Sequence, residues 1–429
     1  MGRQPTMRWA GALGAAAAVT MLAACGGSSD SGKSSSSATT TPKATIDAKV
    51  GTSFSGGEPG KATGAPITVG LINQEGGQVS DPEVRVAIES AFKYINAEQS
   101  GIGGRPLKLK VCNIVSAEEQ GQKCAQQMLN DPSVDTIIQG GLNIGTQAVH
   151  QTINGKKPVF MTLANPGPDT VAKNSYALNP GALAAVPAFG TYINKNLKAK
   201  NVAEISGNNA GDLQIVKLVN KAVEGGGADV KLATFPASST DLVSPLTAAG
   251  AQTADAVMPV VVLPPACISA AKSISQLAIT KPVVGVGLCA TDQIKKALGD
   301  YPKWTFFLTQ LSLDAPDNTG QVAFYKNVMA KYAPKNAELS IGAPAAFGAA
   351  FSVAKILNGV GADKISPAAV SKAGKAFTGP VLLGTPRLKF GSIPGLPAIG
   401  SVASRFYTYK GGGNWQSSGG WLNLPSASA

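Results

Sequence analysis

The sequence predicts an α/β protein whose folded part forms two lobes built on parallel β-sheets. From residue 67 onward, short runs rich in β-branched residues alternate with amphipathic helical segments, which is the pattern of parallel sheets covered by helices. The composition is that of a globular protein, with 44% hydrophobic and 14% charged residues. An N-terminal targeting segment and linker leave about 360 residues, more than one hydrophobic core normally holds. We therefore expect two lobes.

The N-terminal segment, residues 1–24, is predicted to be a secretory signal peptide. Arg3 and Arg8 precede an uncharged, mostly apolar run over 9–24, which is shorter than the roughly 20 residues of a membrane span. The run ends in Leu22-Ala23-Ala24-Cys25, which resembles the lipobox of bacterial lipoproteins. This resemblance implies acylation of Cys25 and a lipid anchor on the extracytoplasmic face of the cell membrane. The alternative is a plain cleaved signal peptide with a cysteine nearby.

Residues 25–65 are predicted to be a disordered tether. Ser, Thr and Gly dominate its first half, and such a segment buries too little apolar surface to offset its ordering entropy. About 40 flexible residues have an end-to-end distance of roughly 35 Å. That distance is enough to hold a folded body clear of a bilayer.

The body opens with a predicted strand over 67–72 and a helix that begins near Pro82, with Asp81 and Glu83 at its positive end. A glycine turn over 101–104 follows a helix and precedes a strand, so it is not a nucleotide-binding fingerprint. Further strands are predicted at 107–112, 134–138, 158–161, 201–205, 229–235, 256–263, 283–286, 305–308, 385–390 and 401–409. Further helices are predicted around Cys124 and at 184–196, 212–223, 268–277, 319–332 and 345–357.

The cysteines indicate an oxidising compartment. Without Cys25, four of the five remain, an even number. Cys112 ends a predicted strand and Cys124 lies in the next helix, while Cys267 and Cys289 bracket a helix and a strand. We therefore predict the disulfides Cys112–Cys124 and Cys267–Cys289.

Charge and motifs favour a binding function over catalysis. The net charge is +12, but the basic residues are scattered, which favours a surface facing an anionic envelope over nucleic-acid binding. The chain has one histidine, His150, and no C-x-x-C motif, so neither a metal nor a cofactor is expected. A G-x-S-x-G elbow, a paired-acid signature and a Cys/His dyad are also absent from the sequence, so no enzyme activity is expected.

Four sequence marks occur in order. They are the strand–loop–helix opening over 67–97, Tyr94-Ile95-Asn96-Ala97 with the turn over 101–107, Gly140-Gly141 with Thr146, and the run 157–160 with Asn165-Pro166. Together they resemble the type I periplasmic-binding-protein superfamily, in particular the leucine/isoleucine/valine-binding branch of ABC-importer receptors. The resemblance covers nearly all of residues 66–409.

The resemblance implies two Rossmann-like lobes joined by a three-crossover hinge, the first over 66–183 and 311–376 and the second over 184–310 and 377–429. It implies a monomer that captures a small molecule in the cleft between the lobes, closes about the hinge and presents its ligand to membrane permease subunits. The ligand would be a branched-chain or other apolar amino acid, or a related small carboxylate or amide. The alternatives are a ligand-sensing surface receptor of the same fold, and an importer receptor for a non-amine apolar or aromatic ligand.

The implied ligand site lies in loops that follow strands, at 73–79, 142–146 and 162–165 in the first lobe and at 208–210, 264–265 and 288–291 in the second. Asn143, Thr162 and the N–H groups near Gly145 would bind a substrate carboxylate. Ala210 stands where amino-acid-binding relatives usually have an aromatic residue, and Asn208, Asn209 and Leu288 stand where they usually have an acid. Asp212 and Asp292 remain candidates for that acid but are better placed to open helices, so a non-amine ligand is an alternative to an amino acid. The expected ligand-binding residues are Gln74, Gly77, Asn143, Thr146, Thr162, Ala164, Asn165, Asn209, Pro264 and Leu288.

Overall fold

The computed structural model describes residues 45–426 except positions 78, 237, 262 and 341. The predicted signal peptide, the lipidation site Cys25 and the tether up to residue 44 lie outside the described residues. We call the two sheet-containing parts of the described body lobe 1 and lobe 2.

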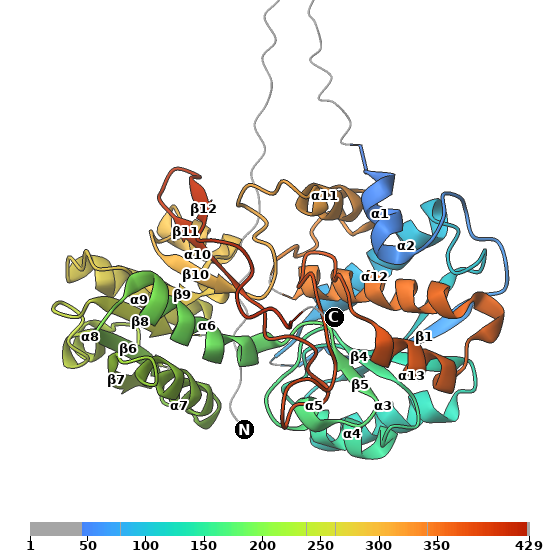
Figure 1. The fold of residues 1–429 in the computed structure, drawn as a ribbon, viewed down its shortest axis with the longest axis horizontal. Coiled ribbons are helices and arrows are strands. Elements are labelled where there is room, and N and C mark those ends of the chain that lie inside the picture. The colour runs from blue at the N-terminus through green and yellow to red at the C-terminus, as the bar shows by residue number, and fades with distance from the viewer. Residues whose placement is uncertain (1–44, 78, 237, 262, 341, 427–429) are drawn as a thin grey trace, which may run out of the picture. The chain divides into compact units, whose positions relative to one another are not determined.

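Lobe 1 is built on a five-stranded, all-parallel sheet with the strand order β2–β1–β3–β4–β5 (Figure 1). Helices cover both faces, so β1, β3, β4 and β5 are mostly buried and appear in the sequence as largely apolar runs, whereas the edge strand β2 is only partly buried. The strands are β1 (Ile67–Gln74), β2 (Leu107–Ile114), β3 (Val134–Gln139), β4 (Val159–Met161) and β5 (Ser175–Ala177).

Two hydrophobic cores cover the opposite faces of this sheet. Leu71 packs in one core and Ile72 in the other, because successive strand side chains point to opposite faces. The first core contains α2 (Pro82–Glu98), α11 (Gln321–Tyr332), α12 (Ala343–Val360) and α13 (Pro367–Ala376). The second contains α3 (Glu118–Asn130) and α4 (Thr146–Ile153).

Helix α12 is the one helix in the described part of the chain that is long and apolar enough to cross a membrane. Most of its side chains are buried in the first core, where Phe347 and Phe351 pack against Phe324 of α11. It also packs along α2. Its hydrophobicity is therefore accounted for by its place in the core of lobe 1.

The prediction of a disordered tether over 25–65 is wrong for the C-terminal end of this segment. Residues 48–55 form α1 (Ala48–Ser55), which begins where the Asp47 carboxylate accepts a hydrogen bond from the Lys49 N–H at 2.9 Å. Phe54 packs in the first core, and Asn358 of α12 donates to the Ser55 carbonyl at 3.0 Å. Tether composition did not reveal this helix because its stability comes from one aromatic contact and from polar contacts with α12.

Lobe 2 has a three-stranded parallel sheet, β7–β6–β8, and a four-stranded sheet, β12–β11–β10–β9. A parallel bridge between Val257 and Val283 joins them, and β10 and β9 continue the parallel direction. The strands are β6 (Asn201–Gly207), β7 (Asp229–Phe235), β8 (Ala256–Val260), β9 (Val284–Val286), β10 (Thr305–Leu308), β11 (Arg405–Tyr409) and β12 (Trp415–Ser417).

Helices again cover both faces of the lobe 2 sheets. One core contains α6 (Ala185–Thr191) and α7 (Ala210–Glu224), and the other contains α8 (Val243–Ala248), α9 (Pro264–Gln276) and α10 (Asp292–Leu298). The short elements that complete the body are α5 (Pro168–Val171), a π-helical turn (Tyr192–Leu197) and three 3-10 turns (Gly181–Ala184, Gly287–Cys289 and Ala362–Lys364).

The chain passes between the lobes three times, after β5, after β10 and between α13 and β11, as expected for a three-crossover hinge. The strand expected over 385–390 does not form. Pro386 lacks an N–H group, and the Leu388 N–H instead donates to the carbonyl of Thr378 at 2.9 Å. Leu388 packs in the first core of lobe 1 and Ile399 in its second, so we propose that lobe 1 extends to about residue 399, beyond the expected boundary at 377.

Both predicted disulfides are present. Cys112 of β2 is bonded to Cys124 of α3, and Cys267 in the first turn of α9 is bonded to Cys289, at the end of the 3-10 turn that follows β9. The Cα–Cα distances are 5.5 and 5.3 Å. The first bond ties α3 to β2, and the second ties the first turn of α9 to the 3-10 turn after β9.

Candidate functional site

The loops expected to bind ligand in lobe 1 meet at one edge of its sheet. Gln74 lies opposite Ile114, Ile72 lies opposite Gln139, and Gln139 lies opposite Met161. Since all five strands run parallel, their carboxyl ends share this edge. The loops after β1, β3 and β4 therefore stand side by side, as expected for a ligand site of an open α/β sheet.

Gln74 holds the loop that follows β3. Its side-chain oxygen accepts hydrogen bonds from the N–H groups of Asn143, at 2.7 Å, and Ile144, at 3.4 Å. The Gln74 side chain is buried, and its amide nitrogen has no hydrogen-bond partner among the described residues. The side chain of Gln74 thus positions the loop instead of facing the solvent.

The N–H groups near Gly145 are already occupied. The Glu118 carboxylate, at the start of α3, accepts from the N–H of Gly145 at 2.7 Å and from that of Ala148 at 3.0 Å. Helix α3 lies very close to the residue that precedes α4, as the lack of a side chain at Gly121 permits. A Cβ at this position would lie only 2.4 Å from the Gly145 carbonyl oxygen. The expectation that the Gly145 N–H would bind a substrate carboxylate is therefore wrong for this structure.

Asp169 forms a buried network behind the loop that follows β4. Its carboxylate accepts from the Gln139 amide at 2.8 Å and from the Asn165 N–H at 2.8 Å, and one of its oxygens lies 2.7 Å from His150 Nε2. Asp169 is fully buried, so these partners satisfy a charge that would otherwise be costly. His150, the only histidine in the sequence, thus has a structural role.

Thr146 and Asn165 share one acceptor, the carbonyl of Leu142. The Thr146 hydroxyl donates to it at 2.9 Å and the Asn165 side-chain amide at 2.7 Å. Two of the expected ligand-binding side chains are therefore used to hold the loop that follows β3. They position the site and leave less polar surface for a ligand.

The other expected residues of lobe 1 differ in their exposure. Asn143 is exposed, and Gly77 is half-buried at a point where a Cβ would lie 2.0 Å from the Val115 carbonyl oxygen. Thr162 and Ala164 are buried. Among the expected side chains of lobe 1, that of Asn143 is the one most open to solvent.

The carboxyl ends of the lobe 2 strands are more apolar. Asn209 and Pro264 lie at the starts of α7 and α9, and Leu288 is 37% exposed. Leu263, next to Pro264, is 50% exposed, and Val79 in the loop after β1 of lobe 1 is 44% exposed. Neither Leu263 nor Val79 was among the predicted ligand-binding residues, although a large apolar residue in a loop that follows a buried strand is a signal that could have identified both.

Most acids near these edges already have partners. Glu75, directly after β1, pairs with Arg85 at 2.7 Å, and this hydrogen-bonded guanidinium lowers the pKa of Glu75. Asp292 is within 3.3 Å of the Tyr301 hydroxyl. Asp81 differs, because its carboxylate has no hydrogen bond among the described residues and burial raises its pKa.

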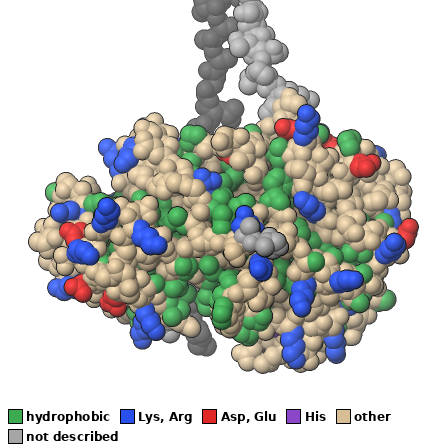
Figure 2. All heavy atoms as spheres, in the orientation of Figure 1, with side chains coloured by type: hydrophobic (Ala, Val, Ile, Leu, Met, Phe, Trp, Pro, Cys, Tyr) green, Lys and Arg blue, Asp and Glu red, His purple; other side chains and the backbone are tan. Residues whose placement is uncertain are grey.

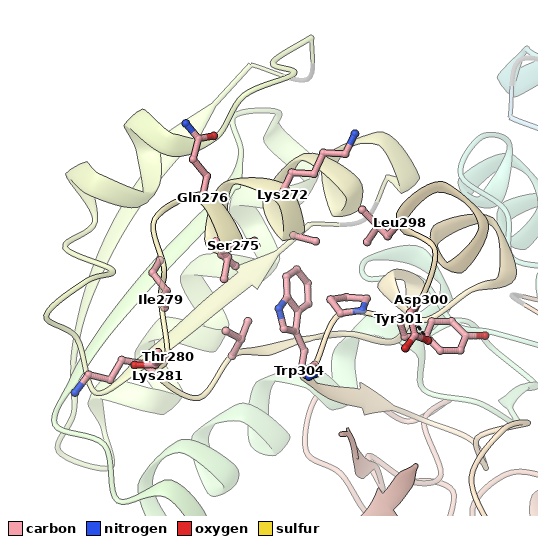
Figure 3. Close-up of a pocket in the computed structure, with 15 residues that line it drawn as sticks. Lys272, Ser275, Gln276, Ile279, Thr280, Lys281, Leu298, Asp300, Tyr301 and Trp304 are labelled. Carbon is pink, nitrogen blue, oxygen red and sulfur yellow. Dashed lines mark hydrogen bonds between the residues drawn. The ribbon is translucent and has the colours of Figure 1, made fainter. Parts of the chain in front are cut away.

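A pocket of about 790 Å³ lies elsewhere in lobe 2, at the amino ends of β9 and β10. Figure 3 shows the Trp304 ring pointing into it, with Lys272 and Lys281 directed outward at its rim. Val283 and Trp304 precede their strands, whereas Leu288 follows β9. This pocket is therefore at the opposite edge of the sheet from the candidate ligand site.

The sequence matches the family model described as "Periplasmic binding protein" over residues 66–390. The chain belongs to this family. Its fold is that of type I periplasmic binding proteins, as the sequence predicted. No curated protein sequence matches the chain significantly.

Solved structures of low sequence identity share the fold. One is a leucine-binding protein from Thermotoga maritima (15% identity, covering 83% of this chain and 99% of that one, TM-score 0.65). Another is a solute-binding protein of an ABC transporter from R. palustris in complex with 4-hydroxybenzoate (16% identity, 84% and 98%, 0.66). A third is a fatty acid ABC transporter substrate-binding protein from Thermomonospora curvata (16% identity, 86% and 95%, 0.64).

Proposed function

We propose that this protein is the extracytoplasmic substrate-binding lipoprotein of an ABC importer and captures a small apolar solute between its two lobes. Family membership supports binding as the function, and the similar structures are described as binding leucine, 4-hydroxybenzoate or fatty acids. Hinge closure would exclude water from the solute and present the loaded form to the permease.

The proposal of an apolar ligand rests on the positions of the exposed hydrophobic side chains. Five large ones are exposed among the described residues, and three of them follow strands at their carboxyl ends: Val79, Leu263 and Leu288. Exposed apolar side chains gathered at a binding edge mark contact with an apolar partner. The partnered acids Glu75 and Asp292 support a ligand without an ammonium group.

Replacing Leu263 or Leu288 with serine is expected to weaken solute binding about tenfold, since each removes a partly exposed apolar contact. A thermal-shift screen of amino acids, aromatic acids, fatty acids, polyols and amides would identify the solute. A ligand at 100 times its Kd stabilises the folded protein by about 2.7 kcal/mol. Isothermal titration of the hit then measures each variant.

Leu218→Ser is the matched control, because Leu218 is 43% exposed on α7, away from the carboxyl edge of the strands. It should bind as tightly as the wild type. Equal losses in all three variants, or none, would contradict the proposed site.

A branched-chain amino acid is the second candidate ligand. Asp81 favours it, because its half-buried carboxylate has no hydrogen bond in the described part of the chain and could pair with an ammonium group. If leucine, isoleucine and valine stabilise the protein and their neutral analogues do not, this candidate is correct and the non-amine ligand is wrong.

The lipid anchor is tested separately. Cys25→Ser is expected to move the protein from the membrane fraction to the medium or periplasm, because the acylated residue is lost while the export signal remains. Fractionation and immunoblotting measure the shift, and Ser28→Ala is the control. A Cys25→Ser protein that stays in the membrane fraction would reject lipidation at this residue.

A further inference from the structure

Four backbone N–H groups at the start of α4 are bound by two side chains of the chain itself. Those of Asn143 and Ile144 donate to Gln74, and those of Gly145 and Ala148 donate to Glu118. Backbone N–H groups at a helix N-terminus form a favourable position for an anion. Here the anion in that position is the Glu118 carboxylate.

Two contacts hold α3, and with it Glu118, in place. Glu118 is the first residue of α3, and the disulfide between Cys112 and Cys124 fixes that helix to β2. The close approach of Gly121 to Gly145 brings the two helices together. The N–H groups just before α3 do not need Glu118, because the Gln120 side-chain oxygen accepts from Val115, Ser116 and Ala117 at 2.8, 2.9 and 3.2 Å.

We propose that Glu118 is a specificity-determining residue, which fills the anion position of α4 so that no carboxylate of a solute is bound there. This inference rests on the proposed solute-binding function. A solute carboxylate approaching the loop would find the N–H groups of Gly145 and Ala148 already bonded to Glu118. It would also be repelled by the negative charge of Glu118. At this loop the receptor therefore prefers a ligand with a neutral group to a ligand of the same shape with a carboxylate.

Chemical rescue by formate tests the anion position without any knowledge of the solute. Glu118→Ala should lose thermal stability, and sodium formate should raise its Tm more than sodium chloride does at equal ionic strength. Wild type and Glu119→Ala should show no such formate-specific rise, because Glu119 is an exposed neighbour whose removal makes the same change in charge. Equal responses to formate in Glu118→Ala and Glu119→Ala would overturn the proposal.

Binding of matched probes tests the selectivity. We expect wild type to bind 4-methylpentanamide more tightly than 4-methylpentanoate, and Glu118→Ala to gain at least tenfold in affinity for the carboxylate with little change for the amide. Glu118→Gln keeps an acceptor for α4 without the charge, so it should gain affinity for the carboxylate while retaining wild-type stability. Urea unfolding confirms that each variant is folded.

Three results separate the inference from the function on which it rests. A wild type that prefers the carboxylate, or a Glu118→Ala variant that gains nothing for it, overturns the role of Glu118 and leaves solute binding intact. If the formate rescue is specific but neither the probes nor any apolar solute of the screen binds wild type, the anion position stands and the proposed function, with the selectivity, is rejected.

Discussion

Replacing Glu204 with glutamine is expected to stabilise the protein by about 3 kcal/mol at pH 7 and to leave its stability nearly unchanged at pH 4. Glu204 is fully buried in the middle of β6, between Leu232 of β7 and Met258 of β8. Neither of its carboxyl oxygens has a well-formed hydrogen bond among the described residues. Removal from water therefore disfavours its charged form strongly.

Burial raises the pKa of Glu204 from 4.5 to about 8, partly opposed by Asn220 nearby and reinforced by the charge of Glu224. The protonated form is thus favoured by folding. Its stabilising contribution is full below pH 4.5 and is lost progressively as the pH rises to about 8. Glutamine does not titrate, so the variant should lack this loss.

Urea unfolding at intervals between pH 4 and pH 8 measures the difference. Asp229→Asn is the control, because Asp229 is an exposed acid at the start of β7, and the stability of this variant should stay within about 0.5 kcal/mol of wild type. Parallel pH profiles for wild type and Glu204→Gln would show that Glu204 does not carry this pH dependence.

Removing the disulfide between Cys267 and Cys289 is expected to destabilise lobe 2 by about 3 kcal/mol and to weaken solute binding as well. The bond closes a loop with a sequence separation of 22 and ties the first turn of α9 to the 3-10 turn that follows β9. Leu263 accepts the first bond of α9, from the Cys267 N–H at 3.0 Å, and Leu288 directly precedes Cys289. Both exposed leucines thus depend on this bond for their position.

The double variant Cys267→Ala/Cys289→Ala tests this by urea unfolding and by titration with the solute well below its Tm. The matched control is Cys112→Ala/Cys124→Ala, whose bond has a sequence separation of 12 and lies in lobe 1. The control should lose similar stability but keep its affinity for an apolar solute. Unchanged affinity in the lobe 2 variant would mean that the leucines are positioned without the bond, or do not contact the solute.

Much of the fold was predictable because the strands of a buried parallel sheet have a distinct composition. The run over 67–72 is rich in β-branched residues and is followed by the polar residues Asn73 and Gln74, and it forms β1, which ends two residues beyond the predicted end. The disulfides were predictable because Cys112 and Cys124 are close in sequence and follow a strand-to-helix pattern. In contrast, α1 was missed, because its packing partners in α12 are distant in sequence, and the same holds for the contacts on which the proposed extension of lobe 1 to residue 399 rests.

The position of the candidate site could be predicted from the sequence, but the roles of its individual residues could not. Loops that follow parallel strands must meet at one edge, so the positions of Gln74, Asn143 and Thr162 follow from the strand pattern. Their hydrogen bonds do not, because Gln74 is 69 residues from Asn143 and Glu118 is 27 residues from Gly145. A polar side chain in such a loop can form a hydrogen bond with a ligand or with the backbone of a neighbouring loop.

The sequence by itself therefore determined the α/β class, the periplasmic-binding-protein resemblance, the cysteine pairs and the edge at which the candidate site lies. All of these depend on local composition and on the order of segments along the chain. Only the tertiary structure decided which polar groups at that edge already have partners and which leucines are exposed. The physical reason is that each backbone N–H and each buried carboxylate takes the partner that the fold brings near it, and the sequence does not specify that distance.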